Sequence, residues 1–268
     1  MRVFLPSRFL AAANLALALQ LGACDDDDDP AGPDDGSTLS AAEAATLATV
    51  VSSSGAIDAE TAPVVELLLG EVRDHGTITF AGASAAAAGP TRLTMARVEG
   101  DYDAIAFQAL VQFSGGGDPE PPTMATGVVG WRGIDTGAGT VEEYFLVIAV
   151  ELGVSEFPTS GNEVIAASDG AEAYYYVDAT TSSYSGTSGT LAWAGASFGG
   201  GSTDCSTTVG PVTINCSYLE GSMAGSLGFM AALVEGSGAP TATFADAAFD
   251  LPALRFTVSD EPAPAAIR

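Results

Sequence analysis

The sequence predicts a mainly β protein, an antiparallel β-sandwich or closed barrel of about ten strands with a small N-terminal helical hairpin. Three observations support this fold class. From residue 77 onward, apolar and polar residues alternate with the period of strands. Clusters of Gly, Pro, Asp and Ser separate the alternating runs, and no helical pattern lies between them. Apolar residues make up 47% of the chain, which excludes a wholly disordered protein.

Residues 1–23 have the anatomy of a secretory signal peptide. Arg2 and Arg8 form a basic start, residues 9–21 are apolar except for Asn14 and Gln20, and small residues precede Cys24. The apolar part is too short to span a bilayer as a helix. The segment Leu21-Gly22-Ala23-Cys24 resembles the lipobox of bacterial lipoproteins. The resemblance implies cleavage before Cys24, attachment of a diacylglyceryl group to its sulfur, and acylation of the new amino group by a fatty acid such as palmitate.

Residues 24–37 are predicted to form a lipidated acidic tether, since five aspartates follow Cys24 at once and the rest is mostly Gly, Pro and Asp. Several acyl chains would anchor the protein durably to a membrane. An aspartate directly after the lipidated cysteine resembles an inner-membrane retention signal, whereas an acidic run resembles a surface-export signal of other bacteria. We therefore expect a lipid-anchored protein of the cell envelope, with inner membrane, outer membrane and cell surface left open.

The first predicted helix covers Ser40 to Ser52. Ser40 and Glu43 have the spacing of a capping box, and Leu47, Val50 and Val51 recur on one side.

The second predicted helix begins at Asp58 or Thr61, with Pro63 tolerated in its first turn. Val64, Leu68 and Val72 form its apolar stripe. We expect it to end at Gly76, where Arg73 and the only histidine, His75, would suit the negative end of a helix.

Strands are predicted from Thr77 onward. Ile105, Phe107 and the following odd-numbered residues to Phe113 share one strand face, while Tyr102, Gln108 and Gln112 share the other. The run Val141–Leu152 is apolar on both faces from residue 144 to 150, which is typical of a central, covered strand. Further predicted strands are Leu93–Val98, Met124–Arg132, Ala171–Thr180, Thr190–Phe198, Gly225–Val234 and Ala242–Val258, the last with Leu254, Phe256 and Val258 alternating against Arg255 and Thr257.

Cys205 and Cys216 are predicted to form a disulfide, because an even pair of cysteines outside the cytoplasm is typically oxidised. Two β-branched stretches flank Gly210-Pro211, and a hairpin centred there pairs residue 209 with 212 and residue 207 with 214. The same register places Cys205 opposite Cys216.

The expected organisation is a signal peptide (1–23), a lipidated acidic tether (24–37), a helical hairpin (38–76), an antiparallel β-domain (77–259) and a flexible tail (260–268).

The chain carries 34 acidic and 8 basic residues, a formal net charge of −26. Nucleic-acid binding needs clustered Lys and Arg, so a nucleic-acid partner is excluded. Divalent cations are plausible counter-ions for such a surface.

Pairs of carboxylates are the main chemical candidates: Asp101/Asp103, Asp118/Glu120, Glu142/Glu143 and Asp169/Glu172. Glycoside hydrolysis needs two carboxylates roughly 5–9.5 Å apart across a cleft. Asp101 and Asp103 share a strand face, so with loop carbonyls they could hold calcium. Solvated surface charge is the competing interpretation and the one that we favour for all four pairs.

Two other motifs are weaker. Residues 195–199 match G-x-S-x-G, but a nucleophile elbow needs a following helix and a downstream His, and no His follows residue 75. Tyr174–Tyr176 with Trp131 and Trp193 could stack on sugars, yet alternation sends Tyr175 to the face opposite Tyr174 and Tyr176.

The sequence thus predicts no catalytic residues and no cofactor, with calcium left open at Asp101 and Asp103. We expect a non-enzymatic envelope lipoprotein, a structural module or one that binds a protein, a glycan or a small molecule. The alternatives are a carboxylate-dependent glycan hydrolase and a calcium-stabilised surface protein.

Overall fold

The computed structural model describes residues 39, 41–53, 61–72, 74–82, 95–112, 122–154, 156–165, 170–177 and 182–259. All of them belong to the second of the two units into which the chain divides, Asp35–Arg268. The predicted signal peptide and tether, Cys24 among them, and the predicted tail at 260–268 lie outside the described residues.

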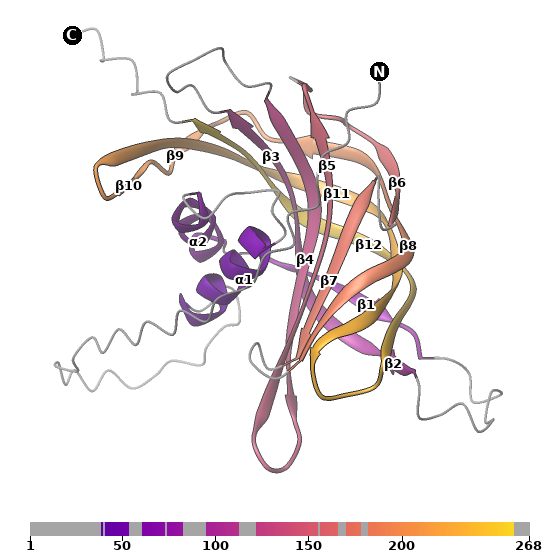
Figure 1. Ribbon diagram of the computed structural model, residues 1–268. Coiled ribbons are helices and arrows are strands. Elements are labelled where there is room, and N and C mark those ends of the chain that lie inside the picture. The colour runs from indigo at the N-terminus through magenta and orange to yellow at the C-terminus, as the bar shows by residue number, and fades with distance from the viewer. Residues whose placement is uncertain are drawn as a thin grey trace, which may run out of the picture. The chain divides into compact units, whose positions relative to one another are not determined.

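The described residues of this unit form two helices and twelve strands (Figure 1). Their bounds are α1 (Ala41–Ser53), α2 (Ala62–Gly70), β1 (Gly76–Phe80), β2 (Ala96–Val98), β3 (Gly100–Gln112), β4 (Thr123–Asp135), β5 (Thr140–Leu152), β6 (Gly161–Ile165), β7 (Ala171–Val177), β8 (Ser182–Phe198), β9 (Thr203–Asp204), β10 (Thr207–Val209), β11 (Val212–Gly236) and β12 (Thr241–Ser259).

The strands form one sheet that closes on itself. Hydrogen-bonded neighbours follow the order β1-β3-β4-β5-β7-β6-β8-β11-β12-β2, with an additional pairing between β7 and β8. The second half of β12 also pairs with β3, from Ala253 opposite Ala106 to Ser259 opposite Gln112. This closing pair is parallel, as are β12–β2 and β6–β7, whereas the other pairs are antiparallel. The predicted mainly β, barrel-like fold with a small helical part is confirmed, and its sheet is mixed.

Aromatic rings fill the interior of the closed sheet. Phe145 on β5 and Phe244 on β12 belong to strands that are not neighbours, yet their ring centroids are 5.8 Å apart. Phe229 on β11 stacks on Phe244 at 4.2 Å. We call this cluster the inner core; its fully buried aromatic members also include Phe80 and Tyr102.

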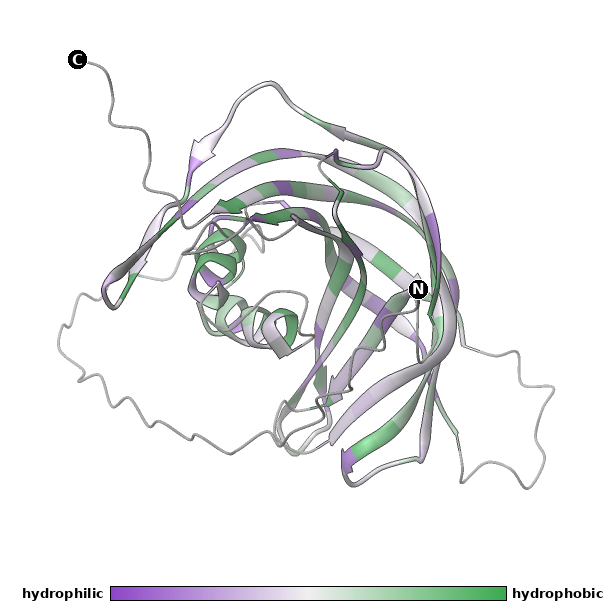
Figure 2. Ribbon diagram, turned by 45° about the horizontal axis from the view of Figure 1, so that its top comes forward, coloured by the Kyte–Doolittle hydropathy of each residue, from purple (hydrophilic) through white to green (hydrophobic). Residues whose placement is uncertain are grey.

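A second apolar cluster, the outer core, lies on the other face of the same strands. Ile105, Phe107, Ala109 and Val111 of β3 belong to it, while Tyr102, Ala104 and Ala106 belong to the inner core. This alternation is the one that the sequence predicts for β3. Helices α1 and α2 cover the outer core, and Figure 2 shows the apolar stretches of their ribbons beside the strands.

Strands β4 and β5 are buried on both faces, because the inner core lies on one side and the helices on the other. Every residue from Met124 to Trp131 is buried, as is every residue from Glu143 to Ala149. The predicted covered strand is therefore confirmed. Gly130 is required by this packing, since a Cβ there would come within 2.1 Å of the Phe145 ring.

Helix α1 buries Leu47, Val50 and Val51 as predicted, while Ser40 of the predicted capping box lies outside the described residues. Neither helix has the length and apolar character needed to cross a membrane, within the part of the chain that the structure describes.

Helix α2 ends at Gly70, and the prediction that it extends to Gly76 is wrong. Gly76 opens β1, whose pairing with residues 100–104 of β3 takes the chain out of the helix. A Cβ at Gly76 would come within 2.6 Å of Leu251, so this glycine permits close packing instead of ending a helix. His75 therefore caps no helix. Arg73 lies outside the described residues.

The disulfide hairpin has the predicted register. Val209 pairs with Val212 and Thr207 with Ile214, and a disulfide joins Cys205 to Cys216. The Cys205 amide also donates to the Cys216 carbonyl at 3.1 Å. Both cysteines and Ile214 are buried in the outer core, and β10 lies beside α2. The hairpin thereby ties one edge of the sheet to the helical cover.

Several other strand limits differ from prediction. The hairpin strand and the predicted strand at 225–234 are one continuous strand of 25 residues, β11, because β8 and β12 pair along most of its length. Strand β8 likewise begins at Ser182 instead of Thr190. Strand β6 was not predicted, since its sequence GNEVI is short and alternates weakly.

Candidate functional site

Asp101 and Asp103, the predicted metal candidates, both interact with neighbouring side chains. Asp101 accepts a hydrogen bond from the Thr79 hydroxyl at 2.8 Å. Asp103 lies 3.2 Å from His75 Nε2, and the His75 ring meets Trp131 edge-on. Asp101 thus links β3 to β1, and Asp103 links β3 to His75, the residue before β1. Among the described residues, no three His, Cys, Asp or Glu side chains come together as a metal site.

The predicted pair Glu142/Glu143 does not converge, because the two residues are adjacent on β5 and point to opposite faces. Asp118, Glu120 and Asp169 of the other pairs lie outside the described residues. Glu172 is exposed and accepts a short hydrogen bond from the Tyr174 hydroxyl.

Glu143 is the acceptor of a buried polar network at the edge of the inner core. Arg132 donates to its Oε2 through Nε at 2.9 Å and Nη2 at 2.7 Å, and the Tyr102 hydroxyl donates to the same oxygen at 2.6 Å. The Arg132 guanidinium lies 4.1 Å from the Tyr102 ring centroid, and its Nη1 donates to the Glu99 carbonyl. Every charge in this network has a partner, as buried charges require.

The same network perturbs the two tyrosines that face it. Burial raises the pKa of Tyr102 well above its ordinary value, and the negative charge of Glu143 adds to the effect. Burial and the charge of Glu143 raise the pKa of Tyr175 in the same direction. Both hydroxyls therefore stay protonated far into the alkaline range.

The predicted aromatic platform is divided between the two cores. Tyr175 and Trp193 belong to the inner core, whereas Trp131 belongs to the outer core and Tyr174 and Tyr176 pack against it. The alternation predicted for the tyrosine run is confirmed. These rings do not form one sugar-stacking surface.

Ser197 of the G-x-S-x-G match lies exposed in β8, and no helix follows it in the described residues 199–259. The strand–turn–helix geometry of a nucleophile elbow is absent at this serine.

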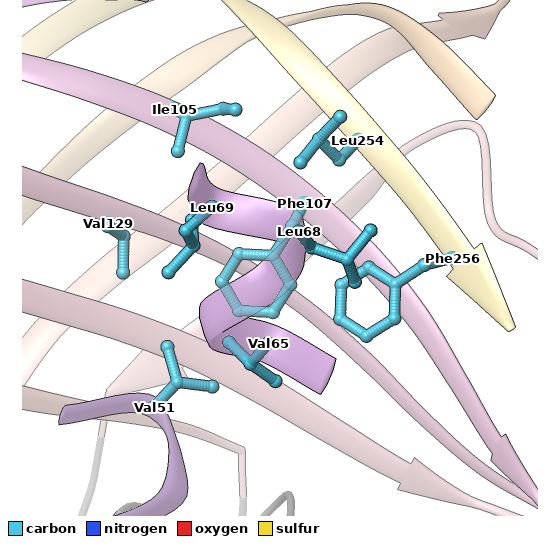
Figure 3. A pocket seen from close by; sticks show the side chains of 9 residues that line it. All are labelled: Val51, Val65, Leu68, Leu69, Ile105, Phe107, Val129, Leu254 and Phe256. Atoms are coloured by element: carbon cyan, nitrogen blue, oxygen red, sulfur yellow. The ribbon is translucent and has the colours of Figure 1, made fainter. Parts of the chain in front are cut away.

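The helix–sheet interface contains a small apolar cavity of about 20 Å³ (Figure 3). Nine aliphatic and aromatic side chains line it: Val51, Val65, Leu68, Leu69, Ile105, Phe107, Val129, Leu254 and Phe256. No polar side chain points into it, so it has no partner to offer a bound water. We interpret it as a packing gap beneath the helical cover.

A crevice of about 190 Å³ opens between the segment after α2 and the strands β11 and β12. Asp74 and Glu220 are on its walls, together with apolar residues such as Ile105 and Leu254. Both carboxylates are exposed.

Arg255 on β12 differs from Arg132 in having no carboxylate partner among the described residues. Its guanidinium carbon lies 4.5 Å from the centroid of Phe157 and 4.3 Å from that of Phe198. The side chain is half-buried, its Nε is buried without a hydrogen-bond partner, and no described carboxylate lies in salt-bridge range. Burial lowers the pKa of Arg255 from its ordinary value, although an arginine stays protonated in proteins.

Gln108 is the neighbour of Arg255 across the closing pair of strands. It is fully buried, and its Nε2 donates to the Pro158 carbonyl at 2.6 Å, while its Oε1 has no partner. The Ala196 amide donates to the Thr159 carbonyl at 3.1 Å. These two bonds hold the segment of Phe157 against β3 and β8. We call Gln108, Phe157, Phe198 and Arg255 the Arg255 site.

Sequence reasoning missed this site. It assigned Arg255 and Thr257 to the polar face of the last strand, and the two residues do share one face. The apolar face of that strand turns outward to the helices, however, and Arg255 shares the face of Leu251 and Ala253 in the inner core. One signal was present, namely a lone arginine in a strand of a strongly acidic chain.

The chain matches no protein-family model, no curated protein and no solved structure.

Proposed function

We propose that this protein is a membrane-anchored lipoprotein of the bacterial cell envelope whose β-domain is a non-enzymatic binding module. The anchor rests on Leu21-Gly22-Ala23-Cys24 and the preceding signal-like segment. The binding role rests on one structural observation: the Arg255 site contains a buried donor and a buried acceptor that nothing in the described chain satisfies. Buried polar groups without partners cost about 1–3 kcal/mol each, which a ligand would recover.

The anchor is tested by replacing the lipidated cysteine. Cys24→Ser should move the protein from the membrane fraction to the soluble fraction and abolish incorporation of labelled palmitate. The unsubstituted protein, expressed alongside, gives the reference distribution. If Cys24→Ser stays in the membrane fraction, the lipid anchor is wrong.

The binding role is tested by native mass spectrometry of protein purified gently from its own membranes, with and without a chelator. We expect a reproducible extra mass on the lipidated chain. A mass lost on chelation would favour the calcium-stabilised alternative. A bare chain in both conditions would contradict the binding role.

The crevice between Asp74 and Glu220 favours a second candidate, hydrolysis of an envelope glycan by paired carboxylates. Asp74→Asn and Glu220→Gln should each abolish release of reducing ends from envelope glycans while leaving the melting temperature unchanged. Glu235→Gln, an exposed carboxylate on β11, is the matched control. If all the variants and the parent are equally inactive on these glycans, this candidate is wrong.

A further inference from the structure

We propose that the Arg255 site binds a small anionic ligand through a carboxylate or phosphate group. The inference rests on the proposed binding function and names the chemistry of its ligand. Planar guanidinium groups present parallel N–H donors that match the paired oxygens of such anions. Arg255 is in the state that this recognition requires, since it is charged and no carboxylate of the residues that the structure describes pairs with it.

The donors of Arg255 are unused. The aromatic rings of Phe157 and Phe198 contact the guanidinium but accept no conventional hydrogen bond. The described part of the chain provides no hydrogen-bond acceptor for Arg255, and Nε is the one nitrogen of this side chain that is buried without a partner. The terminal nitrogens, Nη1 and Nη2, therefore reach solvent, where an anion can approach them.

The lack of a carboxylate at Arg255 is notable in this chain. Acidic residues outnumber basic ones 34 to 8, and Arg132 is fully neutralised by Glu143. Phe157 and Phe198 instead surround Arg255 with hydrocarbon, which raises the strength of any charge interaction made there. The overall negative charge repels anions at long range, so binding depends on these local contacts.

Rigid neighbours hold the site in place. Arg255 lies where β12 is paired to both β3 and β11, and Phe157 is held through the bonds that Gln108 and Ala196 make to its following residues. Such a pre-positioned site loses little freedom on binding.

The test follows the Nε–H signals of the arginines by NMR. Full-length protein, labelled with nitrogen-15 in a non-ionic maltoside detergent, is titrated with sodium acetate or sodium phosphate at constant ionic strength. The Arg255 signal is assigned by its loss in Arg255→Gln. We expect it to shift saturably with at least one anion, and the stronger of the two identifies the ligand group as carboxylate or phosphate.

Two variants sharpen the result. Arg255→Lys keeps the charge but loses the planar fork, so it should weaken anion binding, measured by calorimetry, by about tenfold or more. Arg97→Gln is the matched control, because Arg97 lies exposed on β2 and, within the described ranges, has neither a carboxylate partner nor an aromatic contact. It should bind like the unsubstituted protein.

The inference is overturned if neither anion shifts the Arg255 signal, or if the Arg97 signal shifts equally. Its failure is distinguishable from that of the proposed function. An extra mass in native mass spectrometry that persists in Arg255→Gln would keep the binding module and remove the anion site. The absence of any extra mass, together with no response to anions, would remove both.

Discussion

At the scale of single residues, Arg132 and Glu143 form a buried ion pair whose charges are compensated by each other and by hydrogen bonds. Their side chains are only 16% and 11% exposed, and Glu143 also accepts from Tyr102. Removing one member of such a pair leaves the other without compensation, which costs more than removing both.

We expect Glu143→Gln to lower the free energy of unfolding by about 3–5 kcal/mol, because it removes the counter-charge of Arg132. Combining Glu143→Gln with Arg132→Met should restore part of that loss. Urea unfolding measures both. Glu235→Gln, an exposed strand carboxylate, should change stability by less than about 0.5 kcal/mol. Equal effects of Glu143→Gln and Glu235→Gln would show that the network does not stabilise the fold.

The buried tyrosines predict a loss of stability in alkali. Burial raises the pKa of Tyr102 and Tyr175, so the folded state keeps both protons after the unfolded chain has lost them. Their contribution is complete below pH about 10, the ordinary tyrosine pKa, and declines above it. The free energy of unfolding should fall by about 1.4 kcal/mol per pH unit for each tyrosine.

Urea unfolding between pH 8 and pH 11 measures this decline. Above pH 10, the free energy of unfolding of Tyr102→Phe should fall less steeply with pH than that of the parent, by the amount that corresponds to one proton. An unchanged slope in that variant would contradict the assignment of the effect to Tyr102.

At the scale of elements, α2 packs its buried residues against the sheet in the outer core. Leu68 is 2% exposed and borders the apolar cavity, whereas its neighbour Leu67 is 39% exposed. Adjacent leucines on one helix thus separate the contribution of burial from that of helix propensity.

Leu68→Ala should destabilise the fold by about 2–5 kcal/mol, since it enlarges a cavity in the outer core. Leu67→Ala is the control and should cost less than about 1 kcal/mol. Thermal and urea unfolding of the two variants give the comparison. Similar losses in both would show that α2 contributes little packing to the sheet.

The elements also show which sequence patterns are reliable. The hairpin between Cys205 and Cys216 was predicted to the register, because turn geometry and alternation are local. The end of α2 was predicted six residues too late, since Val72, Arg73 and His75 continue a helix-like pattern. Pairing of Gly76–Phe80 with β3 overrides that pattern, and a pairing partner over twenty residues away leaves no local signal.

At the scale of the whole molecule, charge is the dominant property. A formal charge of −26 produces repulsion among surface carboxylates, which opposes the compact state. Exposed carboxylates such as Asp250 on β12 and Glu235 on β11 lie on different strands, so the repulsion is spread over the sheet.

Salt should therefore stabilise the protein at neutral pH. Raising the salt concentration from 0.01 to 0.15 M shortens the Debye length from about 30 to 8 Å and screens the repulsion. We expect the melting temperature at pH 7 to rise by a few degrees, about 2–4 °C for each kcal/mol gained. Scanning calorimetry at pH 4, near the isoelectric point of about 4.1, is the control and should show no such rise. A salt-independent melting temperature at pH 7 would contradict this account.

The sequence by itself determined the strand periods, the two-sided burial of β5, the disulfide hairpin and the excess of negative charge, because each depends on residues close along the chain or on composition alone. The tertiary structure decided which face of each strand turns inward and where the sheet closes, through the parallel pairing of β3 with β12. It alone placed Gln108 beside Arg255, the Phe157 ring against Arg255, and the Pro158 carbonyl within reach of Gln108. Residues so far apart in sequence meet only when the sheet closes, so the sequence showed the lone arginine but not its neighbours in the site.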